Sequence, residues 1–286
     1  MSEPIGGMIA ATLTPFDASG RVDTSVVEAH VDLLARGGLD GVAPAGTTGE
    51  FLYLSPEERA RVAAAAVRGA AGRLRVIAGI WDLTAEGVGR LARAAESAGA
   101  DAVLLTTPIY YPASDEAIVA WYHSARNHTG LPLYAYSIPQ YAANAVSIPA
   151  LRRLHDDGTI QGIKDSTGKP DRLRELLAGR EGPAVFAASD SFASTARGLG
   201  AHGFISALAN IFPATFMRIW NGDADAQAAI DQVRAAVKGF GGIGGLKTLM
   251  RLRGLDFGRT RLPFGDLLPD DQRALLELAK SLKQMD

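Results

Sequence analysis

Short apolar runs alternate with amphipathic stretches along most of the chain. Most of these runs are apolar on both faces, as strands of a parallel sheet covered on both sides should be. They predict eight strands, at 7–16, 41–46, 75–80, 102–108, 131–139, 160–166, 184–190 and 203–210.

The stretches between the runs carry the apolar spacing of helices. Residues 55–70 begin with Ser55, a helix N-cap residue, and Pro56 stands at the first helical position. Residues 84–100 and 114–130 show the same kind of amphipathic pattern. Strands and helices are therefore expected to alternate.

Eight strands, each followed by a helix, predict a (β/α)8 TIM barrel over residues 1–223. Residues 224–286 lack a strand pattern and predict two or three helices, the last at 269–285. We expect them to form a C-terminal helical extension of the same domain. A doubly wound open sheet fits less well, because eight strands are predicted and no glycine-rich phosphate turn follows the first.

Composition and charge argue against several classes of function. The 286 residues include no cysteine, which excludes disulfides and thiolate chemistry. The formal net charge is −2 and the basic residues form no run, which argues against a nucleic-acid partner. The N-terminus lacks the basic region of a secretory signal, and no apolar window approaches about 18 residues. We expect a cytoplasmic protein with no membrane span.

Several chemical motifs are missing from the sequence. The five histidines form no HxH or HExxH pattern, which argues against a metal-dependent aldolase or hydrolase. No G-x-S-x-G elbow is present. The stretch GGIGGLKT, 241–248, lacks the adjacent glycine-lysine pair of a phosphate loop and follows no strand, so we interpret it as a junction between helices.

In such barrels the catalytic residues gather where the strands end. Polar residues at these positions are Thr14, Thr47, Thr48, Glu50, Tyr110, Tyr111, Tyr136, Lys164, Asp165, Asp190 and Ser206. Each has a structural interpretation that must be weighed beside a catalytic one.

Lys164 ends an apolar strand, where a charge is costly to bury. It could extend its ammonium from the barrel rim or pair with Asp165 or Asp190. It could instead form a Schiff base, since desolvation favours the neutral amine that attacks a carbonyl. Tyr136, at the end of the preceding strand, favours this second interpretation. Its hydroxyl is either a satisfied buried group or a general acid/base facing the same centre.

The loop GTTGE, 46–50, also has two interpretations. It is either an ordinary turn between a strand and a helix or an anion cradle. In the second case its backbone N–H groups and the Thr47 and Thr48 hydroxyls would hold a carboxylate. Tyr110 and Tyr111 follow the fourth strand and are equally compatible with packing or an interface.

Seven motifs occur in order along the chain: TPF (14–16), GTTGE (46–50), PIYYP (108–112), YSIP (136–139), GIKDS (162–166), GFISALAN (203–210) and RLPF (261–264). This combination resembles the dihydrodipicolinate synthase / N-acetylneuraminate lyase superfamily. The resemblance implies a class I pyruvate-dependent aldolase, a carbon-carbon lyase that uses a covalent lysine imine and no metal. It also implies a homotetramer built as a dimer of dimers.

The resemblance assigns a role to individual residues. Lys164 would form the Schiff base with pyruvate or another 2-keto acid, and Tyr136 would relay protons at the reacting C–C bond. Thr47 and Thr48 would hold the pyruvate carboxylate. Thr48 would also pass protons between Tyr136 and Tyr110 of a neighbouring subunit. Ile205 would present its backbone to the pyruvate moiety.

Departures from the family patterns bear on the substrate. Dihydrodipicolinate synthases usually carry an arginine two residues after the YNVP-type motif, and here Tyr141 stands in that place. Losing a bidentate carboxylate clamp argues against lysine biosynthesis. Neuraminate lyases carry an Asp-Glu pair and a serine where this chain has Asp190-Ser191 and Ala207, which argues against sialic acid.

The remaining hypothesis is an aldolase of carbohydrate metabolism that acts on 2-keto-3-deoxy sugar acids such as 2-keto-3-deoxygluconate. A small pocket with Tyr141, Ser206 and Asp190 would suit a short polyol chain, unless an arginine from elsewhere supplies the missing clamp. The alternatives are dihydrodipicolinate synthase, 4-hydroxy-2-oxoglutarate aldolase and a keto-deoxy sugar acid dehydratase using the same imine. A keto-acid-binding relative without catalysis is the alternative of a different class, and it predicts a damaged catalytic set.

Overall fold

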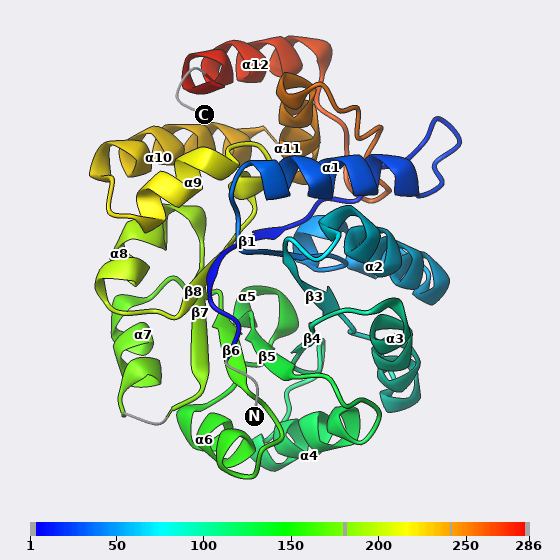
Figure 1. Cartoon of the computed structure of the whole chain (residues 1–286), viewed down its shortest axis with the longest axis vertical. Helices are drawn as coiled ribbons and strands as arrows, with labels where there is room; N and C mark the ends of the chain where they lie inside the picture. The colour runs from blue at the N-terminus through cyan, green and yellow to red at the C-terminus, as the bar shows by residue number, and fades with distance from the viewer. Residues whose placement is uncertain (1–3, 180–181, 241, 284–286) are drawn as a thin grey trace.

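The computed structural model describes residues 4–179, 182–240 and 242–283. Eight parallel strands close into a barrel in chain order, and β8 pairs with β1 (Figure 1). The strands are β1 (Gly7–Ala11), β2 (Gly41–Ala43), β3 (Arg75–Gly79), β4 (Ala102–Thr106), β5 (Leu133–Ser137), β6 (Gly162–Asp165), β7 (Ala184–Ala188) and β8 (Gly203–Ser206). The predicted (β/α)8 barrel is confirmed.

Helices surround the barrel on its outer face (Figure 1). They are α1 (Thr24–Arg36), α2 (Pro56–Ala70), α3 (Ala85–Ala98), α4 (Asp115–Arg126), α6 (Ile148–Asp156), α7 (Pro170–Leu177), α8 (Ala193–Gly198) and α9 (Pro213–Trp220). The short helix α5 (Pro139–Ala142) follows β5 and lies inside this ring, over the barrel (Figure 1). Within the described residues no helix has both the length and the apolar character needed to cross a bilayer.

Local sequence signals explain where the helices begin. The Ser55 hydroxyl accepts a hydrogen bond from the Glu58 backbone N–H at 3.2 Å, and the Glu58 carboxylate accepts one from the Ser55 N–H at 2.9 Å. This capping box, with Pro56 at the first helical position, fixes the start of α2 as predicted. Thr84 and Ser114 are the N-cap residues of α3 and α4, and each side chain accepts a hydrogen bond from a backbone N–H of the first turn.

All eight observed strands are shorter than the apolar runs that predicted them. The first run extends to residue 16, but β1 ends at Ala11, and the following residues form a loop at the barrel rim. Such loops follow the carboxyl ends of the strands and are still buried, so hydrophobicity does not mark the strand end. These buried loops carry most of the pocket described below.

The strands place two layers of side chains inside the barrel, because every second residue of a strand points inward. Tyr134 and Phe186 fill the lower layer, with ring centroids 5.6 Å apart. Glycine stands beside each ring: a Cβ on Gly162 would lie 2.8 Å from Tyr134, and one on Gly203 would lie 2.4 Å from Phe186. The next inward positions on β5 and β6 belong to Tyr136 and Lys164, which therefore stand on a packed floor.

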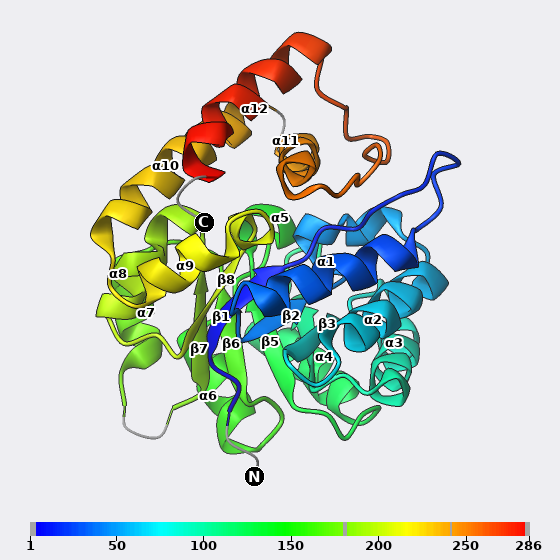
Figure 2. The same ribbon diagram turned by 45° about the horizontal axis from the view of Figure 1, so that its top comes forward.

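The C-terminal helices lie at the carboxyl end of the barrel (Figure 2). They are α10 (Ala224–Gly239), α11 (Ile243–Met250) and α12 (Pro269–Lys283). The stretch 241–248 was interpreted as a junction between helices, but its described part forms Gly242, the N-cap of α11, and the first turns of that helix. Residues of α10 and α11 line the pocket above the strands, so these helices do more than close the fold.

Candidate active site

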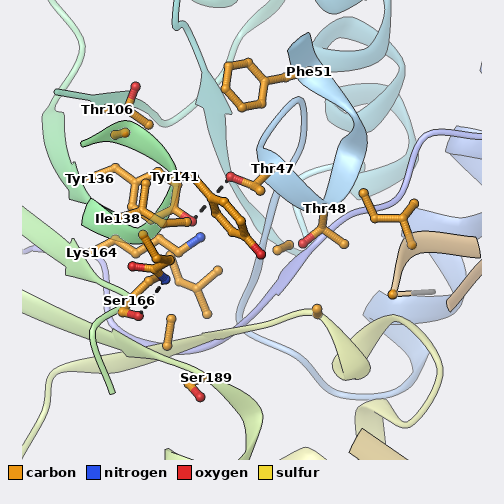
Figure 3. Close-up of a pocket in the computed structure, with 18 of the residues that line it drawn as sticks. Thr47, Thr48, Phe51, Thr106, Tyr136, Ile138, Tyr141, Lys164, Ser166 and Ser189 are labelled. Carbon is orange, nitrogen blue, oxygen red and sulfur yellow. Dashed lines mark hydrogen bonds between the residues drawn. The ribbon is translucent and has the colours of Figure 1, made fainter. Parts of the chain in front are cut away.

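A pocket of about 790 Å³ opens above the carboxyl ends of the strands. This volume lies in the range of small-molecule sites, about 300–1,000 Å³. Figure 3 shows Tyr136 and Lys164 on one side of it and Thr47 and Thr48 on the other. Ile205, at the end of β8, also lines the pocket.

Lys164 and Tyr136 are direct neighbours on adjacent strands. Their Cα atoms are paired in the β5–β6 register, and Lys164 Nζ lies 4.0 Å from the centroid of the Tyr136 ring. Both side chains are buried, 5% and 4% exposed, and both line the pocket. This strand register brings the two side chains to one centre, as expected from the sequence.

The carboxylates that were alternative partners for Lys164 are engaged elsewhere. Asp165 points to the other face of β6, where its carboxylate forms an ion pair with Arg172 at 2.7 Å. Asp190 accepts a hydrogen bond from the Ser206 hydroxyl at 2.7 Å. Within the described residues no carboxylate lies within 4.0 Å of Lys164 Nζ. A structural ion pair therefore does not explain why this lysine is buried.

The environment of Tyr136 favours its ionised form. Burial alone would raise the pKa of this phenol. The positive charge of Lys164, together with hydrogen bonds from Thr47, Ser166 and Lys164, outweighs burial and lowers the pKa below 10.0. The Thr47 and Tyr136 hydroxyl oxygens are 3.5 Å apart (Figure 3). A phenol with a lowered pKa ionises more readily than a free tyrosine, and its phenolate can then accept a proton.

The GTTGE loop forms a short 3-10 turn, Thr47–Gly49, that faces the pocket. The Thr14 hydroxyl donates to the Gly49 carbonyl at 2.7 Å, and a Cβ on Gly49 would lie 3.0 Å from the Thr12 carbonyl oxygen. Glu50 then adopts a left-handed conformation with φ of 58°. This close packing fixes the positions of the Thr47 and Thr48 side chains.

Glu50 has a role that the sequence did not reveal. Its carboxylate is fully buried and forms an ion pair at 2.6 Å with Lys247 of α11, and its other oxygen accepts a hydrogen bond from the Arg261 N–H at 2.8 Å. Lys247 Nζ also lies 4.1 Å from the Phe16 ring centroid. Desolvation lowers the pKa of Lys247, and Glu50 partly opposes this effect. The C-terminal extension thus holds the threonine loop in place.

Asp190 and Ser206 were predicted to contact the substrate, and in the structure only Asp190 lines the pocket. Asp190 lines the pocket, and burial raises the pKa of its carboxyl against the opposing effects of Ser206 and Arg234. Ser206 is fully buried and is not part of the lining. Its hydroxyl donates to Asp190 and accepts from the Ala209 N–H, so the prediction of direct contact does not fit and the serine positions Asp190.

Tyr110 and Tyr141 are exposed, but only Tyr141 lines the pocket. Tyr141 is 73% exposed and lies at the pocket mouth, with its ring directed across it (Figure 3). Tyr110 is 80% exposed, and its ring packs edge-on against Tyr111 with centroids 5.0 Å apart. Within this chain Tyr110 does not reach the lining, as expected of a residue predicted to serve a neighbouring subunit.

Arg234 is a pocket residue that sequence reasoning missed. It extends from α10, and its guanidinium donates to the Ser189 hydroxyl at 3.1 Å and the Ser191 hydroxyl at 3.2 Å. Its helix carried no motif, so nothing in the sequence placed it at the barrel mouth. Three further polar residues of the lining were also missed: Gln140 of α5, and Ser166 and Thr167 of the loop after β6.

In the described part of the chain, no group of three or more His, Asp or Glu side chains is arranged to hold a metal ion. The polar residues that line the pocket are a lysine, an arginine, a glutamine, several residues with hydroxyl groups, and two acids, Glu50 and Asp190. Such a set can form a covalent adduct with a carbonyl compound and hold an anion beside it.

Comparisons with known proteins agree with this geometry. The model of the dihydrodipicolinate synthetase family matches residues 4–285. An uncharacterized DapA-like lyase of Halobacterium salinarum is 34% identical, with 96% of this chain and 93% of that protein covered. A 4-hydroxy-tetrahydrodipicolinate synthase of Gluconacetobacter diazotrophicus is also 34% identical, with 95% of each covered. The crystal structure of dihydrodipicolinate synthase from Aquifex aeolicus superposes with a TM-score of 0.89 at 26% identity, over 97% of this chain and 98% of that one.

Proposed function

Because the chain belongs to the dihydrodipicolinate synthetase family, we propose that Lys164 is the Schiff-base residue of a lyase that cleaves or makes a 2-keto-3-deoxy sugar acid. Membership places the protein among the class I pyruvate-dependent aldolases, which use a lysine imine with pyruvate and no metal. The observation that carries the proposal is Lys164 itself: it is buried in the pocket beside Tyr136, with no carboxylate at ion-pair distance among the described residues.

In the cleavage direction, the neutral Lys164 amine attacks the keto carbon of the acid to give a carbinolamine. The Tyr136 phenol supplies the proton with which the carbinolamine oxygen leaves as water, which gives a protonated imine and the Tyr136 phenolate. Tyr136 takes the proton of the C4 hydroxyl as the C3–C4 bond breaks. The bonding electrons move into the imine, which becomes an enamine, and the aldehyde leaves. Protonation of the enamine and hydrolysis of the imine release pyruvate and restore the lysine. Synthesis is the reverse sequence.

The carboxylate of the keto acid would lie against the GTTGE loop. Thr47 and Thr48 line the pocket opposite Lys164, and the close packing around Gly49 holds their backbone in a tight turn (Figure 3). A turn of this kind presents N–H groups and hydroxyls to an anion without moving. Thr48 would pass protons toward Tyr110 of a neighbouring subunit, and Ile205 would offer its backbone to the pyruvate moiety.

The choice of a sugar acid such as 2-keto-3-deoxygluconate rests on the lining of the pocket. Gln140, Tyr141, Ser166 and Thr167 offer amide and hydroxyl groups that suit a polyol chain. Dehydration of the same acid through the same imine remains an alternative outcome, because it differs only in which substrate bond breaks.

Arg234 supports a second candidate group of substrates. The argument for a neutral polyol tail assumes that no arginine from another part of the chain replaces the missing carboxylate clamp. Arg234 of α10 lines the pocket and weakens that assumption. It keeps open 4-hydroxy-2-oxoglutarate and the second substrate of dihydrodipicolinate synthase, the activity named for the 34% identical relative from Gluconacetobacter diazotrophicus. Each of these compounds would bring into the pocket a carboxylate in addition to that of the pyruvate moiety.

We further propose a homotetramer, a dimer of dimers, in which Tyr110 completes the site of a neighbouring subunit. The exposure of Tyr110 and Tyr111 in the single chain supports this arrangement. We also propose that residues 224–286 are an extension of the barrel domain, because the buried Glu50–Lys247 pair joins the two parts.

The test of the proposed function is release of pyruvate from a panel of keto acids, followed with lactate dehydrogenase and NADH. The panel contains 2-keto-3-deoxygluconate and 4-hydroxy-2-oxoglutarate. The synthetic reaction of pyruvate with aspartate semialdehyde is followed separately, without lactate dehydrogenase, by loss of the semialdehyde. We expect turnover of at least one compound by the wild-type protein and none by Lys164→Met. Binding of pyruvate without turnover of any compound would instead favour a keto-acid-binding relative.

A further inference from the structure

Arg234 presents a positive charge to the pocket that the described part of the chain does not neutralise by an ion pair. Its guanidinium donates hydrogen bonds to the hydroxyls of Ser189 and Ser191, which are neutral. No described carboxylate lies within 4.0 Å of its guanidinium. A guanidinium has five N–H groups, so three remain for a ligand after these two bonds.

The serine that holds Arg234 is itself held in an unusual conformation. Ser189 directly follows β7 and has φ of 87° and ψ of 101°, a region that a residue with a Cβ rarely adopts. Strained backbone of this kind persists at sites where the surrounding structure fixes it, often for a functional purpose. Here it directs the Ser189 hydroxyl to Arg234 Nη2 at 3.1 Å. The guanidinium is thereby oriented before any ligand arrives.

The barrel order places Arg234 one strand away from the reacting lysine. Ser189 follows β7, and β7 pairs with β6, which carries Lys164. The Thr47–Gly49 turn follows β2, several strands away around the rim. An acid whose keto carbon meets Lys164 and whose carboxylate lies on Thr47 and Thr48 would therefore extend its far end along the wall that contains Arg234.

We infer that Arg234 binds a second anionic group, at the end of the substrate distant from the keto acid. The substrate class is thus narrowed to 2-keto-3-deoxy acids with an acidic distal end, in place of the neutral polyol tail of 2-keto-3-deoxygluconate. A terminal carboxylate and a terminal phosphate monoester share this chemistry, and both match the planar fork of a guanidinium. The inference deepens the proposed function and rests on it, since it assumes that the keto end reacts at Lys164.

A purely structural role for Arg234 makes a different prediction. If the arginine only joins α10 to the loop after β7, its replacement would affect all substrates alike. If it binds an anion, its replacement would change the preference between charged and neutral tails. The ratio of kcat/KM values for two substrates therefore separates the two roles, because a general loss of activity cancels in the ratio.

The experiment compares three acids of matched length with a terminal hydroxymethyl, a terminal carboxylate or a terminal phosphate. We expect the wild-type protein to prefer one anionic acid over the neutral one by about 10- to 100-fold in kcat/KM, the range of a charge-assisted hydrogen-bonded pair. Arg234→Gln should abolish most of this preference, mainly through KM. Arg234→Lys should restore part of it, because lysine keeps the charge but loses the fork.

Lys238→Gln is the matched control, since it removes the same charge from an exposed position of the same helix. Lys238→Gln should leave the preference for the anionic acid unchanged. If both glutamine variants lose this preference to the same extent, the effect is a long-range effect of charge, and the inference is overturned. A wild-type preference for the neutral acid, or a preference that Arg234→Gln leaves intact, would also overturn it. Which anionic acid is preferred identifies the anion as carboxylate or phosphate.

Reductive trapping of pyruvate on the wild-type protein distinguishes failure of this inference from failure of the proposed function. Borohydride should fix pyruvate to Lys164 whatever the tail preference. If pyruvate is trapped and no anionic tail is preferred, the inference fails alone. If no pyruvate is trapped, the Schiff-base function fails, and the inference fails with it.

Discussion

The protein contains two lysines that are almost equally buried, and their surroundings differ in charge. Lys164 is 5% exposed and Lys247 is 4% exposed. Lys247 pairs with the Glu50 carboxylate at 2.6 Å and lies outside the pocket lining. Lys164 lines the pocket, stands beside a phenol, and has no described carboxylate within ion-pair distance.

The difference shows that burial alone does not identify a catalytic lysine. A buried ammonium beside a carboxylate is a structural element, since each charge compensates the other. A buried lysine that faces a cavity, with no carboxylate beside it, is instead placed to react with a ligand in that cavity. The two lysines also cooperate: the Lys247 pair holds the loop that carries Thr47 and Thr48, opposite Lys164.

The largest effect on activity is expected from Lys164→Met. The covalent route requires the amine, so turnover should fall by about 10⁴-fold or more, to the background of the assay. The free energy of unfolding should stay the same or rise, because no ion pair is broken and a costly buried amine is removed. Pyruvate release and urea denaturation measure the two quantities. Substantial residual turnover would contradict the assignment of the two lysines.

A smaller loss is expected from Tyr136→Phe. General acid/base catalysis by a positioned side chain contributes about 10²–10⁴-fold, so kcat should fall by that factor. The protein should still form the imine with pyruvate, because Lys164 remains. Single-turnover kinetics and trapping measure these steps separately. If turnover stays close to wild type, the phenol whose pKa Lys164 lowers has no role in proton transfer.

Lys247→Met should act on stability. Removing one partner of a buried pair leaves Glu50 as an uncompensated charge, which costs about 3–5 kcal/mol in the free energy of unfolding. The double variant Lys247→Met/Glu50→Gln should recover much of this loss, because the amide carries no charge. Urea denaturation of the single and double variants measures the coupling. Equal stability of the wild-type protein and Lys247→Met would contradict the structural role assigned to Lys247.

The weakest effect concerns acid stability near the same C-terminal contacts. His30 is buried, its ring packs edge-on against Phe257 at 5.1 Å, and desolvation lowers its pKa from 6.5 to about 4. Between these values the unfolded chain binds a proton that the folded chain does not, so stability falls as the pH falls. The difference corresponds to about 3 kcal/mol at most. His30→Gln should flatten the dependence of unfolding free energy on pH between 7 and 4, and an unchanged slope would refute this.

The sequence predicted the barrel because two kinds of signal coincided. The apolar runs located all eight strands, and caps such as Ser55 located the helix starts. The meeting of Tyr136 and Lys164 could be predicted as well, since neighbouring parallel strands end at the same rim. Strand ends were placed too late, because the loops that follow them are also buried.

Two of the residues that were missed, Arg234 and Lys247, come from the C-terminal helices. Arg234 and Lys247 belong to amphipathic segments whose pattern fixes a helix but not the place where it docks. Their contacts with Ser189 and Glu50 span more than forty positions in the chain, and such separations leave no local signal. Ser206 was misplaced for a related reason. Its position at a strand end predicts that it lies at the barrel rim, but the packing of neighbouring side chains decides whether its hydroxyl reaches the cavity.

The central claim, that Lys164 and not Lys247 is the reactive lysine, has a direct test. The protein is incubated with pyruvate, reduced with borohydride, digested and mapped by mass spectrometry. The account predicts a pyruvate-sized adduct on Lys164 and none on Lys247. An adduct on Lys247 or on surface lysines alone, or no adduct on folded protein, would contradict it.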